Sequence, residues 1–212
     1  MTHFSDRQEA GRRLAPLLSA YAERPDAIVL GLPRGGVLVA AEVATALQLP
    51  LDVFIVRKLG VPWNRELAVG ALASGGVQVL DRDLMAELGL TMRDMQPVLD
   101  EERLELARRE QVFRHGRSPL ELSGKTVILA DDGLATGATM AAAVDAVQQA
   151  GAREIVVAVP VASDSACEAM QRRGVRCVSL AMPRPFYGVG RWYDDFHDTS
   201  DAEVLQALEV VP

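Results

Sequence analysis

Two adjacent carboxylates stand directly before a run of small residues in the stretch ILADDGLATGATM, which covers residues 128–140. An apolar segment ends at Asp131 and Asp132, and the small residues that follow would open a helix. The free N–H groups at a helix start bind anions, and small side chains let a phosphate approach the backbone closely. The two carboxylates can accept hydrogen bonds from hydroxyl groups or hold a hydrated metal ion. Because a sugar phosphate offers both kinds of group, the stretch predicts a sugar-phosphate site.

The predicted phosphate loop consists of Ala135, Thr136, Gly137, Ala138 and Thr139. An alternative is purely structural: the two acids form a turn and Thr136 caps the helix. The ligand site is favoured because the acid pair and the loop occur together.

The sequence GLPRGG at residues 31–36 is a second candidate anion site. Arg34 can direct its guanidinium at phosphate oxygens, and Gly35 and Gly36 expose backbone N–H groups. Taken alone, the stretch is explained equally well by a glycine turn between a strand and a helix.

Both candidate sites follow short apolar runs that are typical of buried parallel strands. Such strands are expected at residues 27–32, 51–56, 126–130, 154–161 and 175–181, with helices at 5–22, 37–47, 137–150 and 163–172. This alternation predicts an α/β fold, a mostly parallel twisted sheet with helices on both faces. Ligands of such sheets bind beyond the carboxyl ends of the strands, where both candidate sites would lie.

Three segments do not follow the alternation, although a single domain over residues 1–212 is expected. Residues 57–80 are punctuated by glycines and predict a long mobile loop with a hairpin. Residues 81–117 are strongly charged and predict a helical insertion without chemistry of its own. Residues 183–198 hold most of the aromatic side chains and predict a small C-terminal unit.

Composition limits the function further. The chain is 49% hydrophobic and has a net charge of −7, which argues against general nucleic-acid binding. Neither an apolar run of membrane-spanning length nor a secretory signal stands out, so a cytoplasmic protein without membrane contact is expected. Cys167 and Cys177 are expected to be reduced structural thiols, and the three histidines are scattered too widely to suggest a metal site.

The stretch VILADDGLATGATM resembles the phosphoribosyl-pyrophosphate signature of type I phosphoribosyltransferases. The resemblance implies that Asp131 and Asp132 bind the ribose hydroxyls and that residues 135–139 wrap the 5′-phosphate. Two positions depart from the family pattern: Gly133 replaces an aliphatic residue, and Ala135 replaces an aspartate of purine-salvage members. Without that aspartate, a base within the loop is not expected.

GLPRGG resembles the pyrophosphate-binding loop of the same family, so Arg34, Gly35 and Gly36 are expected to bind pyrophosphate. This loop often contains a non-proline cis peptide bond, which would fit at Arg34. The family also has a flexible loop that closes over the reacting centre, and here it would begin near Lys58. Lys58 is the best candidate for a further cation on the pyrophosphate, and Glu66 in the loop has no assigned role.

The aromatic segment 183–198 is similar to the hood of hypoxanthine-guanine phosphoribosyltransferases, which covers the acceptor. The resemblance implies acceptor binding by Phe186, Tyr187 and Trp192, with Phe186 stacking on a base. For Trp192 and Phe196, the alternative is a small aromatic core that ties the tail to the sheet. The resemblance also implies Asp194, Asp195 or Asp198 as an Mg²⁺ ligand. Asp195 is the chosen candidate, the ion being held otherwise by substrate and water. The lysine that recognises the purine in those enzymes has no evident counterpart, so purine specificity is not indicated.

The expected function is therefore that of an Mg²⁺-dependent phosphoribosyltransferase, a glycosyltransferase of nucleotide salvage. It would transfer the 5-phosphoribosyl group to a nucleophile, in our interpretation a nucleobase, and release pyrophosphate, with Arg34, Lys58, Asp131 and Asp132 in catalysis. An alternative is a non-catalytic regulator that senses phosphoribosyl pyrophosphate or a nucleotide on the same fold. Receiver-type and dinucleotide-binding folds are disfavoured by missing motif residues. The acceptor stays unidentified; a homodimer would be in keeping with the family, but the sequence leaves the oligomeric state open.

Overall fold

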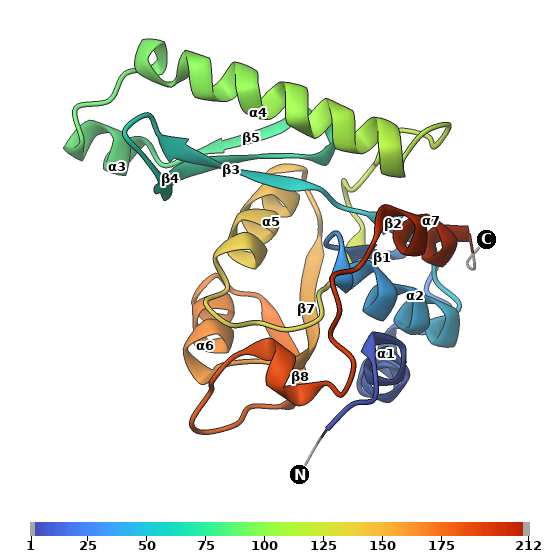
Figure 1. Cartoon of the computed structure of the whole chain (residues 1–212). Coiled ribbons are helices and arrows are strands. Elements are labelled where there is room, and N and C mark those ends of the chain that lie inside the picture. The colour runs from blue at the N-terminus through green and yellow to red at the C-terminus, as the bar shows by residue number, and fades with distance from the viewer. Residues whose placement is uncertain (1–2, 210–212) are drawn as a thin grey trace.

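A parallel five-stranded sheet lies at the centre of the computed structural model, which describes residues 3–209 (Figure 1). Its strand order is β2-β1-β6-β7-β8, and every neighbouring pair is parallel. The strands are β1 (Ala27–Gly31), β2 (Leu51–Val53), β6 (Thr126–Ala130), β7 (Glu154–Val161) and β8 (Arg176–Ala181). The predicted α/β fold class is thereby confirmed.

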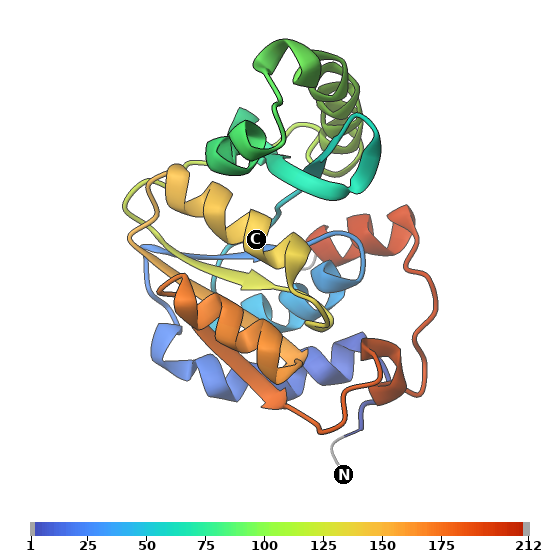
Figure 2. The same ribbon diagram turned by 90° about the vertical axis from the view of Figure 1, so that its left-hand side faces the viewer.

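Helices cover both faces of this sheet because its strands are apolar on both sides (Figure 2). Val29 and Ile128 point to one face, and Leu30 and Leu129 to the other. The first face is covered by α1 (Arg7–Leu14), the 3-10 helix η1 (Ala15–Tyr21), α2 (Gly35–Leu47) and α7 (Asp201–Glu209). The second face is covered by α5 (Ala138–Gln149) and α6 (Asp164–Arg172).

Of the long mobile loop with a hairpin predicted for residues 57–80, the hairpin is confirmed and the long loop is wrong, because a three-stranded antiparallel sheet occupies this segment. It consists of β3 (Val56–Val61), β4 (Asn64–Ala73) and β5 (Val77–Leu80), and the short 3-10 helix η2 (Ser74–Gly76) joins the last two strands. Gly60 and Gly70 serve close packing within the sheet, whereas Gly75 and Gly76 adopt positive φ angles in the η2 turn. A Cβ on Gly60 would overlap the backbone of Arg65, and one on Gly70 would lie 2.9 Å from the Leu80 side chain.

The predicted helical insertion is confirmed as α3 (Arg82–Glu87) and the long helix α4 (Met92–Phe113). A capping box between Thr91 and Asp94 fixes the start of α4. Met95, Leu99 and Leu106 form its buried face, and they belong to the same apolar cluster as residues of the five-stranded sheet. Figure 1 shows α4 lying across β3–β5, apart from the main sheet. One apolar cluster thus joins both sheets. Residues 1–2 and 210–212 of the predicted domain lie outside the described residues.

Within residues 3–209, no helix combines the length and the apolar character that a membrane crossing needs.

Candidate functional site

The two candidate motifs meet because β1 and β6 are neighbours in the sheet. Gly31 pairs with Ala130, and the N–H of Leu32 donates to the carbonyl of Ala130 at 3.0 Å. The chain therefore leaves both strands side by side at their carboxyl ends. As expected from the resemblance, the Pro33–Arg34 peptide bond is cis.

Gly35 and Gly36 let the first motif pack directly against the acid pair. A Cβ on Gly36 would lie 2.7 Å from Oδ1 of Asp131, and one on Gly35 would overlap the carboxylate of Asp132. Since any side chain would push the acids away, both glycines are needed for the contact. Sequence reasoning placed these two motifs together correctly.

The carboxylates of Asp131 and Asp132 are half-buried and lie close enough to influence each other. Burial raises the pKa of Asp131 well above its ordinary value, and the negative charge of Asp132 raises it further. Burial also raises the pKa of Asp132, although Arg7 opposes the shift. A cation or hydroxyl donors at this point would relieve the repulsion, which is the property expected of a ligand site.

Arg7 is a member of the site that sequence reasoning missed. Its Nε donates to Oδ2 of Asp132 at 2.8 Å, and its other guanidinium nitrogen Nη1 donates to the carbonyl of His197 at 2.9 Å. The guanidinium also lies 4.0 Å from the centre of the Phe196 ring. Arg7 is only 6% exposed, so this is a buried cation, and two of its three guanidinium nitrogens form hydrogen bonds. Its partner is 125 positions away in the sequence, and no local pattern signals the contact.

Tyr193 also contacts Asp132, through the backbone of that residue. Its hydroxyl donates to the carbonyl of Asp132 at 2.6 Å. Its ring packs between Phe4 and Phe196, with centroid distances of 5.3 and 5.1 Å. Burial raises the pKa of Tyr193, so the phenol stays protonated as a donor. Part of the aromatic segment thus forms a small core that ties the C-terminal segment to α1.

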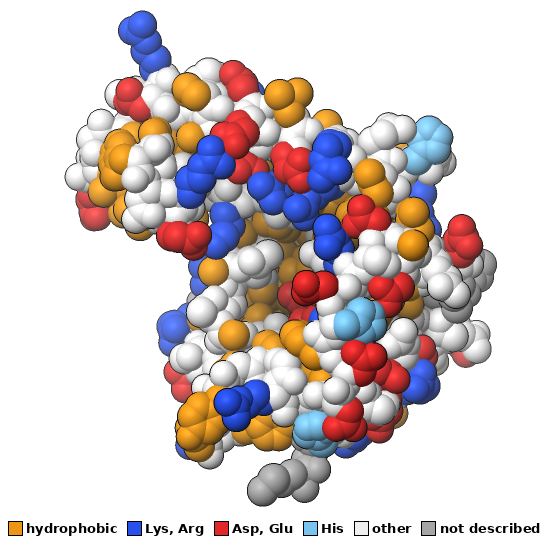
Figure 3. Space-filling view, in the orientation of Figure 1, with side chains coloured by type: hydrophobic (Ala, Val, Ile, Leu, Met, Phe, Trp, Pro, Cys, Tyr) orange, Lys and Arg blue, Asp and Glu red, His pale blue; other side chains and the backbone are white. Residues whose placement is uncertain are grey.

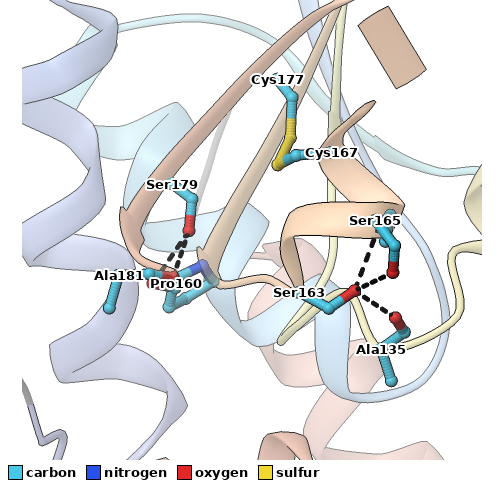
Figure 4. Close-up of a disulfide and its surroundings, with 9 residues drawn as sticks. Ala135, Pro160, Ser163, Ser165, Cys167, Cys177, Ser179 and Ala181 are labelled. Atoms are coloured by element: carbon cyan, nitrogen blue, oxygen red, sulfur yellow. Dashed lines mark hydrogen bonds between the residues drawn. A yellow bond between two sulfur atoms is a disulfide. The ribbon is translucent and has the colours of Figure 1, made fainter. Parts of the chain in front are cut away.

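The predicted phosphate loop forms an open helix start. Gly137 adopts a left-handed conformation (φ +76°) and precedes α5, whose first residues are exposed. The N–H of Ala138 donates weakly to Oγ1 of Thr136 at 3.4 Å, and Thr139 is exposed. From α6, the Ser163 hydroxyl donates to the carbonyl of Ala135 at 2.6 Å (Figure 4). This bond ties the loop to the start of α6, while Ala135, Thr136, Ala138 and Thr139 are exposed.

The expectation of two reduced thiols is wrong for this structure. Cys167 on α6 and Cys177 on β8 form a disulfide, with their Cα atoms 5.7 Å apart (Figure 4). The two residues are ten positions apart, but the α6–β8 turn returns the chain so that they face each other. The disulfide ties α6, which supports the phosphate loop, to the edge strand.

Arg34 lies in the arginine-glycine loop as predicted, but its guanidinium is already paired with a carboxylate of the chain. Its Nε forms an ion pair with Oδ1 of Asp201 at 3.0 Å, and a terminal nitrogen donates to the carbonyl of Thr199 at 3.4 Å. Asp201 is the first residue of α7, and Thr199 lies two positions before it. An anion that binds Arg34 must therefore compete with Asp201.

Lys58 is not brought together with the acid pair. The predicted strand 51–56 leaves the main sheet after Val53, so Lys58 falls within β3 instead of at the carboxyl edge. It lines a cavity of about 240 Å³ with Arg65, Glu101 and Glu102. The acid pair and the phosphate loop do not line that cavity, and the structure therefore offers no support for Lys58 on the pyrophosphate.

The predicted acceptor residues differ in their surroundings. Tyr187 is 74% exposed and lies near Arg191, while Phe186 and Trp192 are half-buried. Trp192 belongs to the 3-10 helix η3 (Val189–Trp192) and packs beside the Phe4–Tyr193 core. The same helix explains Gly133: a Cβ there would lie 3.0 Å from Cβ of Val189 and would overlap its methyl groups. Val189 of the hood thus fills the space that an aliphatic side chain at position 133 would occupy.

The carboxylate of Asp195, the candidate metal ligand, is hydrogen-bonded to a histidine. It accepts a hydrogen bond from Nδ1 of His197 at 2.8 Å, and Nε2 of His197 contacts Glu203 at 2.8 Å. These bonds lower the pKa of Asp195 and raise that of His197. In the part of the chain that the structure describes, no three such side chains are grouped so that they could hold a metal ion. The carboxylates of Asp131 and Asp132 suit Mg²⁺, which binds one or two carboxylates together with substrate oxygens and water.

Comparison with known proteins identifies the family. A family model described as the phosphoribosyl transferase domain matches residues 6–181. The chain belongs to this family. Its predicted relationship to phosphoribosyltransferases is thereby confirmed. Arg7, the arginine-glycine loop, the acid pair and the phosphate loop lie within the matched residues, whereas the aromatic segment 183–198 follows them.

Individual relatives agree with this assignment. Two Mycobacterium tuberculosis proteins named as phosphoribosyl transferases are each 44% identical over 209 residues, covering 99% of this chain and 47% of theirs. The chain thus spans about half the length of these relatives. TT1426 from Thermus thermophilus is 41% identical, with a TM-score of 0.87 and 97% coverage of both chains. A Neisseria gonorrhoeae protein solved with bound ppGpp shares the fold alone, at 15% identity, a TM-score of 0.52 and coverage of 98% and 93%.

Proposed function

We propose that this chain transfers the 5-phosphoribosyl group from phosphoribosyl pyrophosphate to a nucleophile, a nitrogen of a planar base, and releases pyrophosphate. One observation carries the proposal: a half-buried acid pair, an arginine-glycine loop and an open helix start meet at one sheet edge. Each suits a different part of the donor, namely the ribose hydroxyls, the pyrophosphate and the 5′-phosphate. Family membership supports the same donor.

The proposed chemistry is positional and electrostatic. Asp131 and Asp132 accept hydrogen bonds from the ribose hydroxyls, and the N–H groups of residues 135–139 hold the 5′-phosphate. The bond from C1 to the pyrophosphate oxygen breaks while the bond to the acceptor nitrogen forms. Arg34 stabilises the charge that develops on the departing pyrophosphate. Because Ala135 provides no base, the acceptor loses its proton to a group outside the loop.

Mg²⁺ is the proposed cofactor, and when bound it supplies positive charge to the pyrophosphate. Phe186 and Tyr187 are the proposed stacking surface for the base, because Trp192 is partly used in the aromatic core. The proposed setting is nucleotide salvage in the cytoplasm.

The test combines donor binding with pyrophosphate release over a panel of purines, pyrimidines and small amines. Isothermal titration with phosphoribosyl pyrophosphate and Mg²⁺ is expected to show binding that the double variant Asp131→Asn and Asp132→Asn loses by at least tenfold. At least one acceptor is expected to give pyrophosphate. Tight donor binding without release from any acceptor would favour the sensing regulator, and release that persists in the double variant would contradict the assigned site.

A further inference from the structure

Arginines from two distant segments converge where the insertion meets the C-terminal helix. Arg34 lies before α2, whereas Arg108 and Arg109 lie on α4, and all three line one small cavity together with Val112, Phe113 and Asp201. Figure 3 shows Lys and Arg side chains gathered beneath α4 at the rim of the hollow that separates it from the core. Such a cluster is costly to hold together unless anions lie within it.

Two carboxylates within the chain partly neutralise the cluster. Glu105 binds Arg108 through both oxygens, at 2.8 and 2.9 Å, and binds Nε of Arg109 at 2.8 Å. Asp201 pairs with Arg34 at 3.0 Å. The pKa of Arg108 is raised mainly by Glu105, and the negative charge of Asp201 raises it further, so Asp201 acts on both sides of the cavity. Three positive charges face two negative ones, and one positive charge is left over.

Asp201 is the replaceable anion of this group. Its side chain is 47% exposed, and that of Arg34 is 50% exposed, so their ion pair contributes little to stability. The start of α7 does not depend on Asp201, because Ser200 and Glu203 cap it: each backbone N–H donates to the other side chain, at 2.8 and 3.3 Å. A stronger anion can therefore displace Asp201 without unfolding the helix.

We propose that Arg108 and Arg109 bind the pyrophosphate of phosphoribosyl pyrophosphate together with Arg34, in the position that Asp201 occupies. This inference rests on the proposed function. Arg34 is joined directly to Gly35, which packs against Asp132, and the Arg34 side chain lines the cavity that Arg108 and Arg109 also line. Arg34 therefore connects the proposed ribose site to the arginines of α4. Planar guanidinium groups bind phosphate oxygens in pairs, which suits a diphosphate. The insertion then supplies the cations that Lys58, within β3, does not.

The test is isothermal titration of the intact protein with Mg²⁺ and three ligands: inorganic pyrophosphate, phosphoribosyl pyrophosphate and ribose 5-phosphate. Arg108→Gln and Arg109→Gln are each expected to weaken both pyrophosphate-containing ligands about tenfold, as loss of one charged hydrogen-bonding group does. Ribose 5-phosphate affinity should change less than twofold, because its phosphate binds at residues 135–139. Asp201→Asn is expected to strengthen pyrophosphate binding several-fold.

Arg103→Gln is the matched control, since Arg103 lies on the same helix but binds Asp100 and Gln78 and does not line this cavity. It is expected to leave all three affinities unchanged. Native-like binding by both α4 variants, or an equal loss in Arg103→Gln, would overturn the inference while the proposed function stands. If the unaltered protein bound neither ribose 5-phosphate nor phosphoribosyl pyrophosphate, the proposed function would be wrong, and the inference, which rests on it, would be wrong as well. Thermal melting checks that each variant is folded. If Arg108→Gln is not, Arg109→Gln carries the test alone, and its native-like binding overturns the inference.

Discussion

Removing the charge of Arg7 is expected to destabilise the protein by far more than removing a surface arginine. The side chains of Arg7 and Asp132 are 7% and 18% exposed, so the change Arg7→Met leaves a buried carboxylate without its cation. Breaking such a pair costs about 3–5 kcal/mol. Asp132 keeps some solvent contact and can take up a proton, which favours the lower end. We therefore expect a loss of about 3 kcal/mol, or a fall in Tm of roughly 6–12 °C for a chain of this size.

The matched control is Arg12→Met on the same helix. Arg12 pairs with Glu42 at 3.1 Å, but its side chain is 56% exposed. Exposed pairs contribute about 0–1 kcal/mol, so Arg12→Met should melt close to the native temperature. Adding Asp132→Asn to Arg7→Met should restore part of the stability, because it removes the unpaired charge.

The same variant tests the electrostatics of the site. Burial raises the pKa of Asp132 and Arg7 lowers it, so the loss of Arg7 lets the pKa rise further. Because the ribose hydroxyls donate to the ionised carboxylate, donor binding in Arg7→Met should require a higher pH than in the native protein. The reasoning is refuted if Arg7→Met has the same Tm as Arg12→Met and if the pH dependence of its donor binding is the same as in the native protein.

Three further changes follow from the packing and charges around the site. Burial raises the folded-state pKa of Asp131, so its ionised form costs stability that the protein regains as the pH falls. Asp131→Asn should therefore raise the Tm at pH 8, lose that advantage near pH 4, and weaken donor binding. A Tm at pH 8 that stays native or falls would contradict this. Gly133→Ala should lower the free energy of unfolding by about 1–3 kcal/mol, because the new methyl group overlaps Val189, and adding Val189→Ala should restore the stability. If urea unfolding shows no such restoration, the clash with Val189 is not the cause. Asp195 and Glu203 raise the pKa of His197, so its charge stabilises the fold at low pH and the effect fades as the pH rises through the raised pKa. His197→Gln should therefore lower the Tm more at pH 6 than at pH 9, and an equal loss at both would argue against it.

The arrangement of the two motifs could be predicted from the sequence for a simple topological reason. Alternating strands and helices build a parallel sheet, and a parallel sheet brings the ends of its strands to one edge. The acid pair and the arginine-glycine loop both follow strands, and β1 and β6 prove to be neighbours. Their glycines then confirm the contact, because the space that a Cβ would need is filled by the opposite motif.

What the sequence did not indicate depends on contacts between distant segments. Arg7 reaches Asp132 from a helix at the other end of the chain, and Arg34 meets Asp201 in the same way. Lys58 was misplaced because one apolar run supplies strands to two different sheets. In residues 57–80, glycine was interpreted as a turn former, but Gly60 and Gly70 allow close approach between strands instead.

The most direct test of this account is a crystal structure of the protein with phosphoribosyl pyrophosphate and Mg²⁺. The ribose hydroxyls are expected within about 3 Å of the carboxylates of Asp131 and Asp132, at hydrogen-bonding distance, with the 5′-phosphate on the N–H groups of residues 135–139. A ligand bound away from this sheet edge, or acids that still contact protein groups alone, would contradict it.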